Sequence, residues 1–184
     1  PRSQAKVINL GLFYGMGKAK LQAELGVSKD KAEELFSIYH ERVPFVKSLT
    51  KSVSNRAQQR GQIRTLLGRL CRFHLWEPNQ FGIHKALPFD QARQEYGAGI
   101  KRAYTYKALN KLIQGSAADM TKKSMLELYK EGIVAHIQVH DELDISVEDD
   151  IKAKRIKEIM ESAVELEIPN KVDFEKGANW GDIK

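Results

Sequence analysis

Residues 133–147, with the sequence IVAHIQVHDELDISV, decide the fold class of this chain. The run from Ile133 to Val139 is rich in β-branched residues, and a second apolar run, Leu143 to Val147, follows the polar residues 140–142. Two short apolar runs around a tight polar turn predict an antiparallel β-hairpin. Because helix signals account for most of the other residues, we predict an α+β fold, mostly helical with a small antiparallel sheet.

Helix signals are distributed along the whole chain. Ser28 is a favourable N-cap residue, Pro44 suits the first turn of a helix, and Gly61 suits a helix end. These signals and the apolar periodicity predict a helical stretch over residues 2–24, with a break near 15–17. They also predict helices over residues 29–41, 44–60 and 104–131, a helix that begins at about residue 91, and a final helix from Asp149 or Asp150 to about residue 165.

Two further strands and one irregular segment complete the expected organisation. Short strands are expected at residues 62–66 and 172–175. The segment 76–89 contains two prolines and a glycine, which favours an irregular surface excursion. We expect a boundary between two lobes either at Gly61 or within residues 76–89.

Composition excludes several classes of protein. The 184 residues are 42% hydrophobic, which suffices for a sizeable core and is too apolar for a disordered tail. No run approaches the roughly 20 apolar residues that a membrane span needs. A single cysteine, Cys71, excludes a disulfide framework and a structural zinc site. The first residues show no secretory pattern, so we expect a reducing, cytoplasmic setting and no membrane partner.

The chain is basic, with 30 lysines and arginines against 24 aspartates and glutamates, a net charge of +6 and a pI near 9.3. This balance attracts polyanions and is typical of nucleic-acid-binding domains. A protein with a lysine-rich surface and no such partner has the same composition, so charge alone leaves both interpretations open.

The first predicted helix carries a line of candidate binding residues. Four side chains are spaced by four residues and therefore follow one slowly winding line: Arg2, Lys6, Leu10 and Tyr14. The two cations suit a polyphosphate, and the two apolar side chains offer a surface for a sugar and a base. The alternative is an amphipathic helix with a solvated cationic face. In either case the opposite side should pack on a core through Ala5, Ile8 and Leu12.

The turn of the predicted hairpin carries His140, Asp141 and Glu142. Mg²⁺ prefers hard oxygen ligands and usually takes one or two protein carboxylates together with substrate phosphates. A hairpin turn presents such carboxylates at the surface, where a nucleic-acid phosphate can reach them. The alternative is an ordinary polar β-turn, in which aspartate is a common residue.

A third set of candidates lies near the start of the longest predicted helix. Asn110 and Gln114 are four residues apart, and Lys107 and Lys111 share their face. Amides and cations in a row can follow a DNA minor groove, whose acceptors are similar for all base pairs. The alternative is a solvated surface helix with a small-residue packing patch at residues 115–118.

The order of these segments resembles that of a known family. Residues 2–15, with the pattern RxxxKxxNxGxxYG, resemble motif B of the family A DNA polymerases, the O helix of the fingers. Residues 138–142 (QVHDE) resemble motif C of the palm, and residues 109–119 (LNxxIQGxAAD) resemble the Q helix. Residues 65–69 (TLxGR) resemble a segment at the base of the fingers, and residues 177–180 (GANW) are similar to the family's C-terminal ending. The likeness is to phage or bacterial members.

On the O helix, the resemblance implies contacts with the incoming nucleotide. Arg2 and Lys6 would contact its triphosphate. Leu10 stands where the family commonly has phenylalanine or tyrosine facing the sugar, so this departure leaves sugar discrimination open. Tyr14 would stack near the templating position.

In the palm, the resemblance implies catalysis by two Mg²⁺ ions that stabilise the attacking and leaving oxygens of nucleotidyl transfer. Asp141 would be a ligand of these ions, with Glu142 in a supporting catalytic role. His140 would lie beside the primer terminus.

The resemblance also implies contacts with primer–template DNA. Asn110 and Gln114 would follow its minor groove. Lys107 and Arg69 are further candidates for DNA contacts. Arg102 is another candidate, which matches the family pattern less closely.

The implied domains are fingers over residues 1–60, the end of the fingers with the irregular excursion over 61–103, and the C-terminal part of the palm over 104–184. Motif A, which carries the other metal-binding aspartate, and the thumb have no counterpart in these residues. We therefore expect a fragment or split subunit of a DNA-directed DNA polymerase, inactive alone. Its expected partners are primer–template DNA, dNTPs and a chain that supplies motif A and the thumb.

Two alternatives belong to other functional classes. The chain could be a non-catalytic DNA- or nucleotide-binding module, or a polymerase remnant. It could also be an unrelated basic helical nucleic-acid binder, although the ordered motifs disfavour this third hypothesis.

Overall fold

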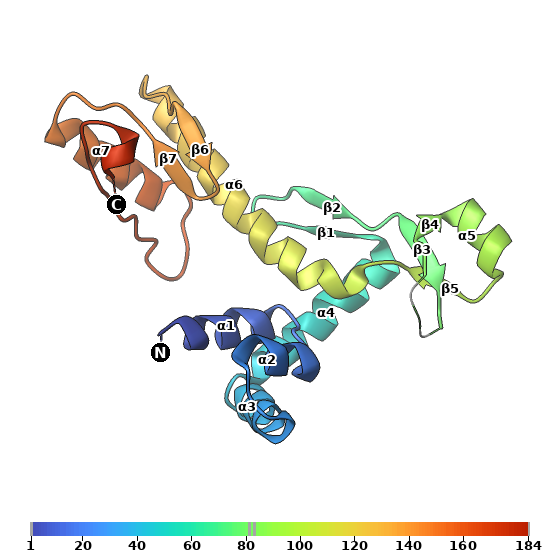
Figure 1. Cartoon of the computed structure of the whole chain (residues 1–184). Coiled ribbons are helices and arrows are strands. Elements are labelled where there is room, and N and C mark those ends of the chain that lie inside the picture. The colour runs from blue at the N-terminus through green and yellow to red at the C-terminus, as the bar shows by residue number, and fades with distance from the viewer. Residues whose placement is uncertain (1, 81, 83, 184) are drawn as a thin grey trace. The chain divides into compact units, whose positions relative to one another are not determined.

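The structure, a computed structural model, describes residues 2–80, 82 and 84–183 and confirms the α+β class (Figure 1). It divides into two compact units, Pro1–Ile113 and Gln114–Lys184. The division falls within helix α6, Ala108–Lys130, and not at Gly61 or within residues 76–89, where we expected it. The reason is that the two ends of α6 belong to different cores: Leu109 is buried in the first and Leu128 in the second.

Four helices begin the first unit, with bounds close to those predicted. They are α1 (Arg2–Phe13), α2 (Lys18–Leu25), α3 (Lys29–Arg42) and α4 (Pro44–Arg60). The Ser28 side chain caps α3 by accepting a hydrogen bond from the Lys31 backbone N–H at 3.3 Å. Gly61 ends α4 in the left-handed region, with φ of 68°, where a side chain would be strained.

Two small antiparallel sheets follow. Strands β1 (Gln62–Arg64) and β2 (Leu70–Arg72) form a hairpin, which places a strand where one was predicted. Strands β3 (Leu75–Pro78), β4 (Leu87–Pro88) and β5 (Ile100–Arg102) form a sheet in the order β4-β3-β5, beside helix α5 (Phe89–Tyr96).

The expectation of an irregular excursion over residues 76–89 is therefore wrong at the two ends of that segment, where β3, β4 and the start of α5 lie, and is met at residues 79, 80, 82 and 84–86, which belong to no helix or strand. Residues 81 and 83 lie outside the described residues. Pro78 and Pro88 are the last residues of their strands, where a missing N–H costs little, and Pro88 directly precedes α5. The Arg102 guanidinium lies 4.5 Å from the centre of the Trp76 ring and so links β5 to β3.

The core of the first unit joins α4, the β1–β2 hairpin and the start of α6. Its buried members are Val53, Ala57, Ile63, Phe73, Ala108 and Leu109. A 3₁₀ turn, η1 (Thr105–Lys107), precedes α6, so the long helix begins four residues later than predicted. Tyr104 explains the delay, because its φ of 61° is incompatible with a right-handed helix.

The second unit contains the predicted hairpin. Strands β6 (Ile137–Val139) and β7 (Glu142–Asp144) pair antiparallel and are shorter than the apolar runs that predicted them. Helix α7 (Asp150–Ser162) is capped by Asp149, whose carboxylate accepts a hydrogen bond from the Lys152 N–H at 2.7 Å. A final 3₁₀ turn, η2, covers Trp180–Asp182.

The second core packs α7 against the end of α6 and the hairpin. Leu128, Ile133, Ile156 and Ile159 are buried, and partly buried residues that include Leu143 and Ile145 pack on them. At the surface, Arg155 of α7 donates to both carboxylate oxygens of Glu131, at 3.1 and 2.5 Å. These hydrogen bonds lower the pKa of the Glu131 carboxyl below its ordinary value.

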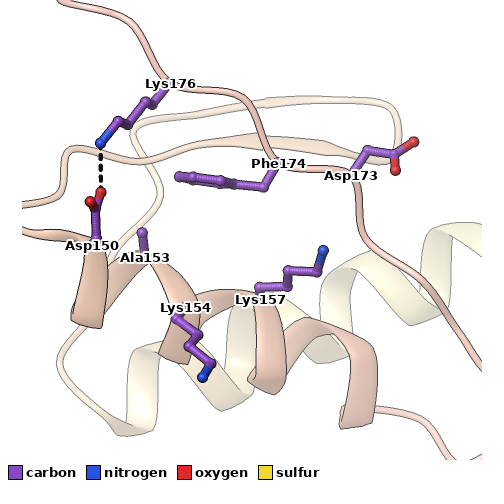
Figure 2. A pocket seen from close by; sticks show the side chains of 7 residues that line it. All are labelled: Asp150, Ala153, Lys154, Lys157, Asp173, Phe174 and Lys176. Atoms are coloured by element: carbon purple, nitrogen blue, oxygen red, sulfur yellow. Dashed lines mark hydrogen bonds and ion pairs between the residues drawn. The ribbon is translucent and has the colours of Figure 1, made fainter.

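The strand predicted at residues 172–175 does not form, which corrects that expectation. The backbone N–H of Val172 donates instead to the Glu161 side chain of α7, at 3.1 Å. Phe174 lies alongside α7 without pairing to a strand (Figure 2). A β-prone sequence becomes a strand only where another strand offers its free edge.

Across the described ranges, no helix has both the length and the apolar character that crossing a bilayer would require.

Two leucines on α6 provide a matched test of this packing. Leu128 is 1% exposed and Leu126 is 48% exposed. We predict that Leu128→Ala lowers the free energy of unfolding by about 2–5 kcal/mol, because it leaves a cavity in the second core. Leu126→Ala should cost less than about 1 kcal/mol. Urea denaturation measures both, and equal losses would contradict the assigned core.

Candidate functional site

Helix α1 exposes the predicted line of binding residues. Arg2 and Lys6 are exposed, Leu10 is 46% exposed, and Tyr14, just after the helix, is half-buried. The structure describes no carboxylate paired with either cation. The line is therefore accessible to a ligand from its cationic end to its aromatic end.

The opposite side of α1 packs mainly through its C-terminal half. Leu12 is 1% exposed and Ile8 is partly buried, as predicted. Ala5 is exposed, which corrects the expectation that it packs on a core.

Gly11 has a structural role that the motif alone did not reveal. A Cβ atom built at this glycine would lie 2.4 Å from the Met16 side-chain methyl, and the Met16 N–H donates to the Gly11 carbonyl at 2.8 Å. The chain therefore folds back over Gly11 after α1. This packing, together with the edge-to-face contact of Phe13 and Tyr14 at 5.3 Å, holds the aromatic end of the line.

The β6–β7 hairpin places the predicted carboxylates at a tight turn. Val139 pairs with Glu142, which leaves His140 and Asp141 as the two loop residues. His140 has a φ of 55°, an uncommon conformation for a residue other than glycine, and its carbonyl accepts a hydrogen bond from the Gln138 side chain at 3.0 Å. Both loop residues and Glu142 are exposed.

This arrangement fits part of a metal site. Adjacent exposed carboxylates are suitable ligands for Mg²⁺, which is commonly bound by one or two of them together with phosphate oxygens. Among the described residues, no group of three or more His, Cys, Asp or Glu side chains gathers in a way that could hold a metal ion. The hairpin therefore offers one or two ligands, and the others would have to come from a substrate or from residues beyond those described.

The start of α6 exposes the predicted row of amides and cations. Asn110 and Gln114 are both exposed and lie one turn apart on the helix. The Lys107 ammonium lies 5.3 Å from the centre of the Tyr104 ring, and that of Lys111 lies 5.3 Å from the centre of the Phe73 ring. The aromatic rings thus hold both cations close to the backbone while leaving them at the surface.

The two arginines singled out in the middle of the chain differ in accessibility. Arg69 is exposed beside the turn between β1 and β2. Arg102 is partly buried and already engaged, since it donates to the carbonyl of Gln58 at 3.2 Å and to that of Phe73 at 2.9 Å. Arg102 therefore links α4, the end of β2 and the three-stranded sheet. No local sequence pattern predicts this role, because it depends on tertiary contacts.

A hollow of about 650 Å³ in the second unit lies between α7 and the C-terminal segment, where Lys157 and Phe174 line it (Figure 2). On one side of it, the Lys176 ammonium pairs with the Asp150 carboxylate at 2.6 Å. None of the predicted site residues lines this hollow. They lie instead on exposed helical faces and at a hairpin turn, which suits a large ligand better than an enclosed small molecule.

Comparison with known proteins identifies the family. The model of "DNA polymerase family A" matches residues 1–182. A DNA-directed DNA polymerase of Pseudomonas phage M6 is 33% identical over 98% of this chain and 29% of that protein. DNA polymerase I of Bacillus caldotenax is 33% identical over 100% of this chain and 20% of that protein. The chain thus spans less than a third of the length of these relatives.

A solved structure gives the same result. The POL domain of Pol1 from M. smegmatis, in complex with DNA primer-template and dNTP, superposes with a TM-score of 0.69 and 28% sequence identity, over 91% of this chain and 28% of that one. The agreement of sequence, motif order and fold leads to one conclusion: the chain belongs to DNA polymerase family A.

Proposed function

We propose that this chain supplies the nucleotide-binding fingers and the C-terminal half of the palm to a DNA-directed DNA polymerase that performs template-directed nucleotidyl transfer. The observation that carries the proposal is the hairpin turn that exposes Asp141 and Glu142, in a chain whose family match covers residues 1–182. Residues 1–60 serve as fingers, 61–103 complete the fingers, and 104–184 belong to the palm. The partly buried thiol of Cys71, without a disulfide, is compatible with a cytoplasmic enzyme.

Helix α1 binds the incoming dNTP. Arg2 and Lys6 contact the triphosphate, because a guanidinium fork and an ammonium are effective donors to phosphate oxygens. Leu10 lies against the sugar, where its branched aliphatic side chain gives contact without a hydroxyl group. Tyr14, held against Phe13, stacks near the templating base.

The hairpin turn holds the metal-binding carboxylate. Asp141 is a ligand of Mg²⁺, and Glu142 supports it from the first residue of β7. When bound, Mg²⁺ supplies charge stabilisation to the attacking and leaving oxygens of the reaction. His140, whose φ is fixed by the turn, lies beside the primer terminus.

Contacts with primer–template DNA come from exposed side chains of both units. Asn110 and Gln114 follow the minor groove, and Lys107 and Arg69 neutralise phosphates. The exposure of these four residues supports the assignment. So does the solved relative, which is a complex with primer-template DNA and dNTP.

Catalysis requires a further metal-binding carboxylate, because two metal ions cannot be held by one hairpin turn. In this proposal it comes from motif A, carried by a segment outside these 184 residues or by a partner chain that also provides the thumb. Without it, the chain binds nucleotide and DNA but does not extend a primer.

We predict that Lys6→Ala raises the KM for dNTPs by about tenfold or more, the loss expected for one charge-assisted hydrogen bond. Primer–template affinity should stay within about twofold, because Lys6 contacts only the nucleotide. Steady-state primer extension measures the KM in the polymerase assembled with motif A and thumb. The matched control is Lys20→Ala, at an exposed lysine of α2. An unchanged KM would remove Lys6 from the nucleotide site.

Asp141→Asn should reduce extension by more than about 100-fold in the same assembly, since it removes a metal ligand. The DNA dissociation constant should change little. Asp144→Asn is the control on the same hairpin, because Asp144 is partly buried at the far end of β7. Parallel losses of DNA binding and extension in Asp141→Asn would show that the substitution disrupts the fold, and they would contradict a metal-binding role.

A further inference from the structure

Positive charge is concentrated in one stretch of the first unit. Between Glu41 and Glu77 the chain has eight lysines and arginines and no carboxylate. The net charge of the whole chain is +6, so the remaining residues together carry a small negative charge. The stretch comprises α4, the β1–β2 hairpin and the beginning of β3.

The strand register determines which of these cations share a face. Gln62 pairs with Arg72, and Arg64 pairs with Leu70, so these side chains lie on one face of the hairpin. The opposite face carries Ile63, which is 3% exposed and belongs to the core. Arg64 and Arg72 therefore lie on the outward face, and both are exposed.

The backbone beneath these two arginines is firmly held. The Phe73 N–H donates to the Gly61 carbonyl at 2.8 Å, and the Arg102 guanidinium donates to the Phe73 carbonyl. Arg64 uses one nitrogen to donate to the Gly68 carbonyl at 3.0 Å, which orients its guanidinium while its remaining N–H donors stay available.

One further cation lies close to the hairpin along the chain. Arg60 is exposed at the last residue of α4, directly before Gly61 and β1. Lys111 lies over the ring of Phe73, which belongs to the core with Ile63, so Lys111 is not assigned to the outward face.

We infer that the outward face of the β1–β2 hairpin, through Arg64 and Arg72, is a binding surface for the phosphate backbone of a nucleic acid. Arginine forks match phosphate oxygens, and no carboxylate of the stretch competes for them. The exposed leucines of this hairpin, Leu66 and Leu67, lie in its turn, whereas its paired outward residues are Gln62, Arg64, Arg72 and the partly buried Leu70. Charge therefore dominates the face, which suits phosphates better than the apolar centre of a protein interface. The surface goes beyond the contacts of Arg69, Lys107 and α6 proposed above.

The test is the salt dependence of DNA binding by the full 184-residue chain. The variants are Arg64→Ala/Arg72→Ala and, with charge retained, Arg64→Lys/Arg72→Lys. The charge-matched control is Lys29→Ala/Lys31→Ala, because these exposed lysines stand among Asp30, Glu33 and Glu34. Fluorescence anisotropy with a labelled single strand and a duplex of the same sequence gives the dissociation constants between about 50 and 200 mM salt.

We expect the alanine pair to weaken binding by about tenfold at the lowest salt and to reduce the slope of log K against log salt by about 2. The lysine pair should retain most of the slope, and the thermal midpoint of each variant should match that of the parent. A slope change on either probe supports the inference and identifies which form of DNA the face contacts.

If the alanine pair left the slope unchanged on both probes, the inference would be overturned. It would also be overturned if the control Lys29→Ala/Lys31→Ala reduced the slope as much as the alanine pair does. Absence of salt-dependent binding by the parent chain would do the same. The result does not depend on primer extension, so this surface and the proposed polymerase function can fail separately.

Discussion

The two-residue turn between Val139 and Glu142 is the constraint on which the candidate catalytic site depends. Because these residues pair across the hairpin, Asp141 has no opposite neighbour and its carboxylate is exposed. His140 accepts a left-handed conformation, which costs about 1–2 kcal/mol for a residue with a side chain. Packing of Leu143 and Ile145 on the second core holds the hairpin in place against that cost. The candidate metal-binding carboxylate is thus positioned by strand pairing and by a core that lies outside the site.

The charges that a polymerase needs are divided between the two units. The first unit exposes cations on α1, on the β1–β2 hairpin and at the start of α6, and these suit the phosphates of a nucleotide and of DNA. The second unit exposes the carboxylates of the β6–β7 hairpin, which suit a divalent cation. Helix α6 joins the two, because Leu109 is buried in one core and Leu128 in the other. The residues proposed for binding and those proposed for catalysis therefore rest largely on separate cores, and α6 contributes to both cores.

Much of the fold could be predicted because its signals are local. The caps and helix ends at Ser28, Pro44, Gly61 and Asp149 act within a few residues, and the structure has all four. The polar turn of the β6–β7 hairpin is equally local. The exposed line on α1 followed from helical periodicity alone. On the opposite side of the helix, the same periodicity wrongly predicted that Ala5 is buried.

The features that sequence reasoning missed depend on contacts between distant residues. Strands β3, β4 and β5 are two to four residues long, too short for an alternating pattern, and they form because Trp76 pairs with Leu87 and Arg102. The strand expected at residues 172–175 fails for the complementary reason, because β propensity without a neighbouring strand does not form a sheet. Arg102, a candidate for DNA contact, proves to be engaged by carbonyls of Gln58 and Phe73.

Primer extension with Mg²⁺ and four dNTPs tests the central claim most directly, using the purified chain alone and then mixed with a polypeptide that carries motif A and the thumb. The account predicts extension in the mixture and none from the chain alone, because the β6–β7 hairpin supplies only part of the metal site. Extension by the chain alone would contradict that claim. No extension in either case, with DNA binding retained, would favour a non-catalytic binding module.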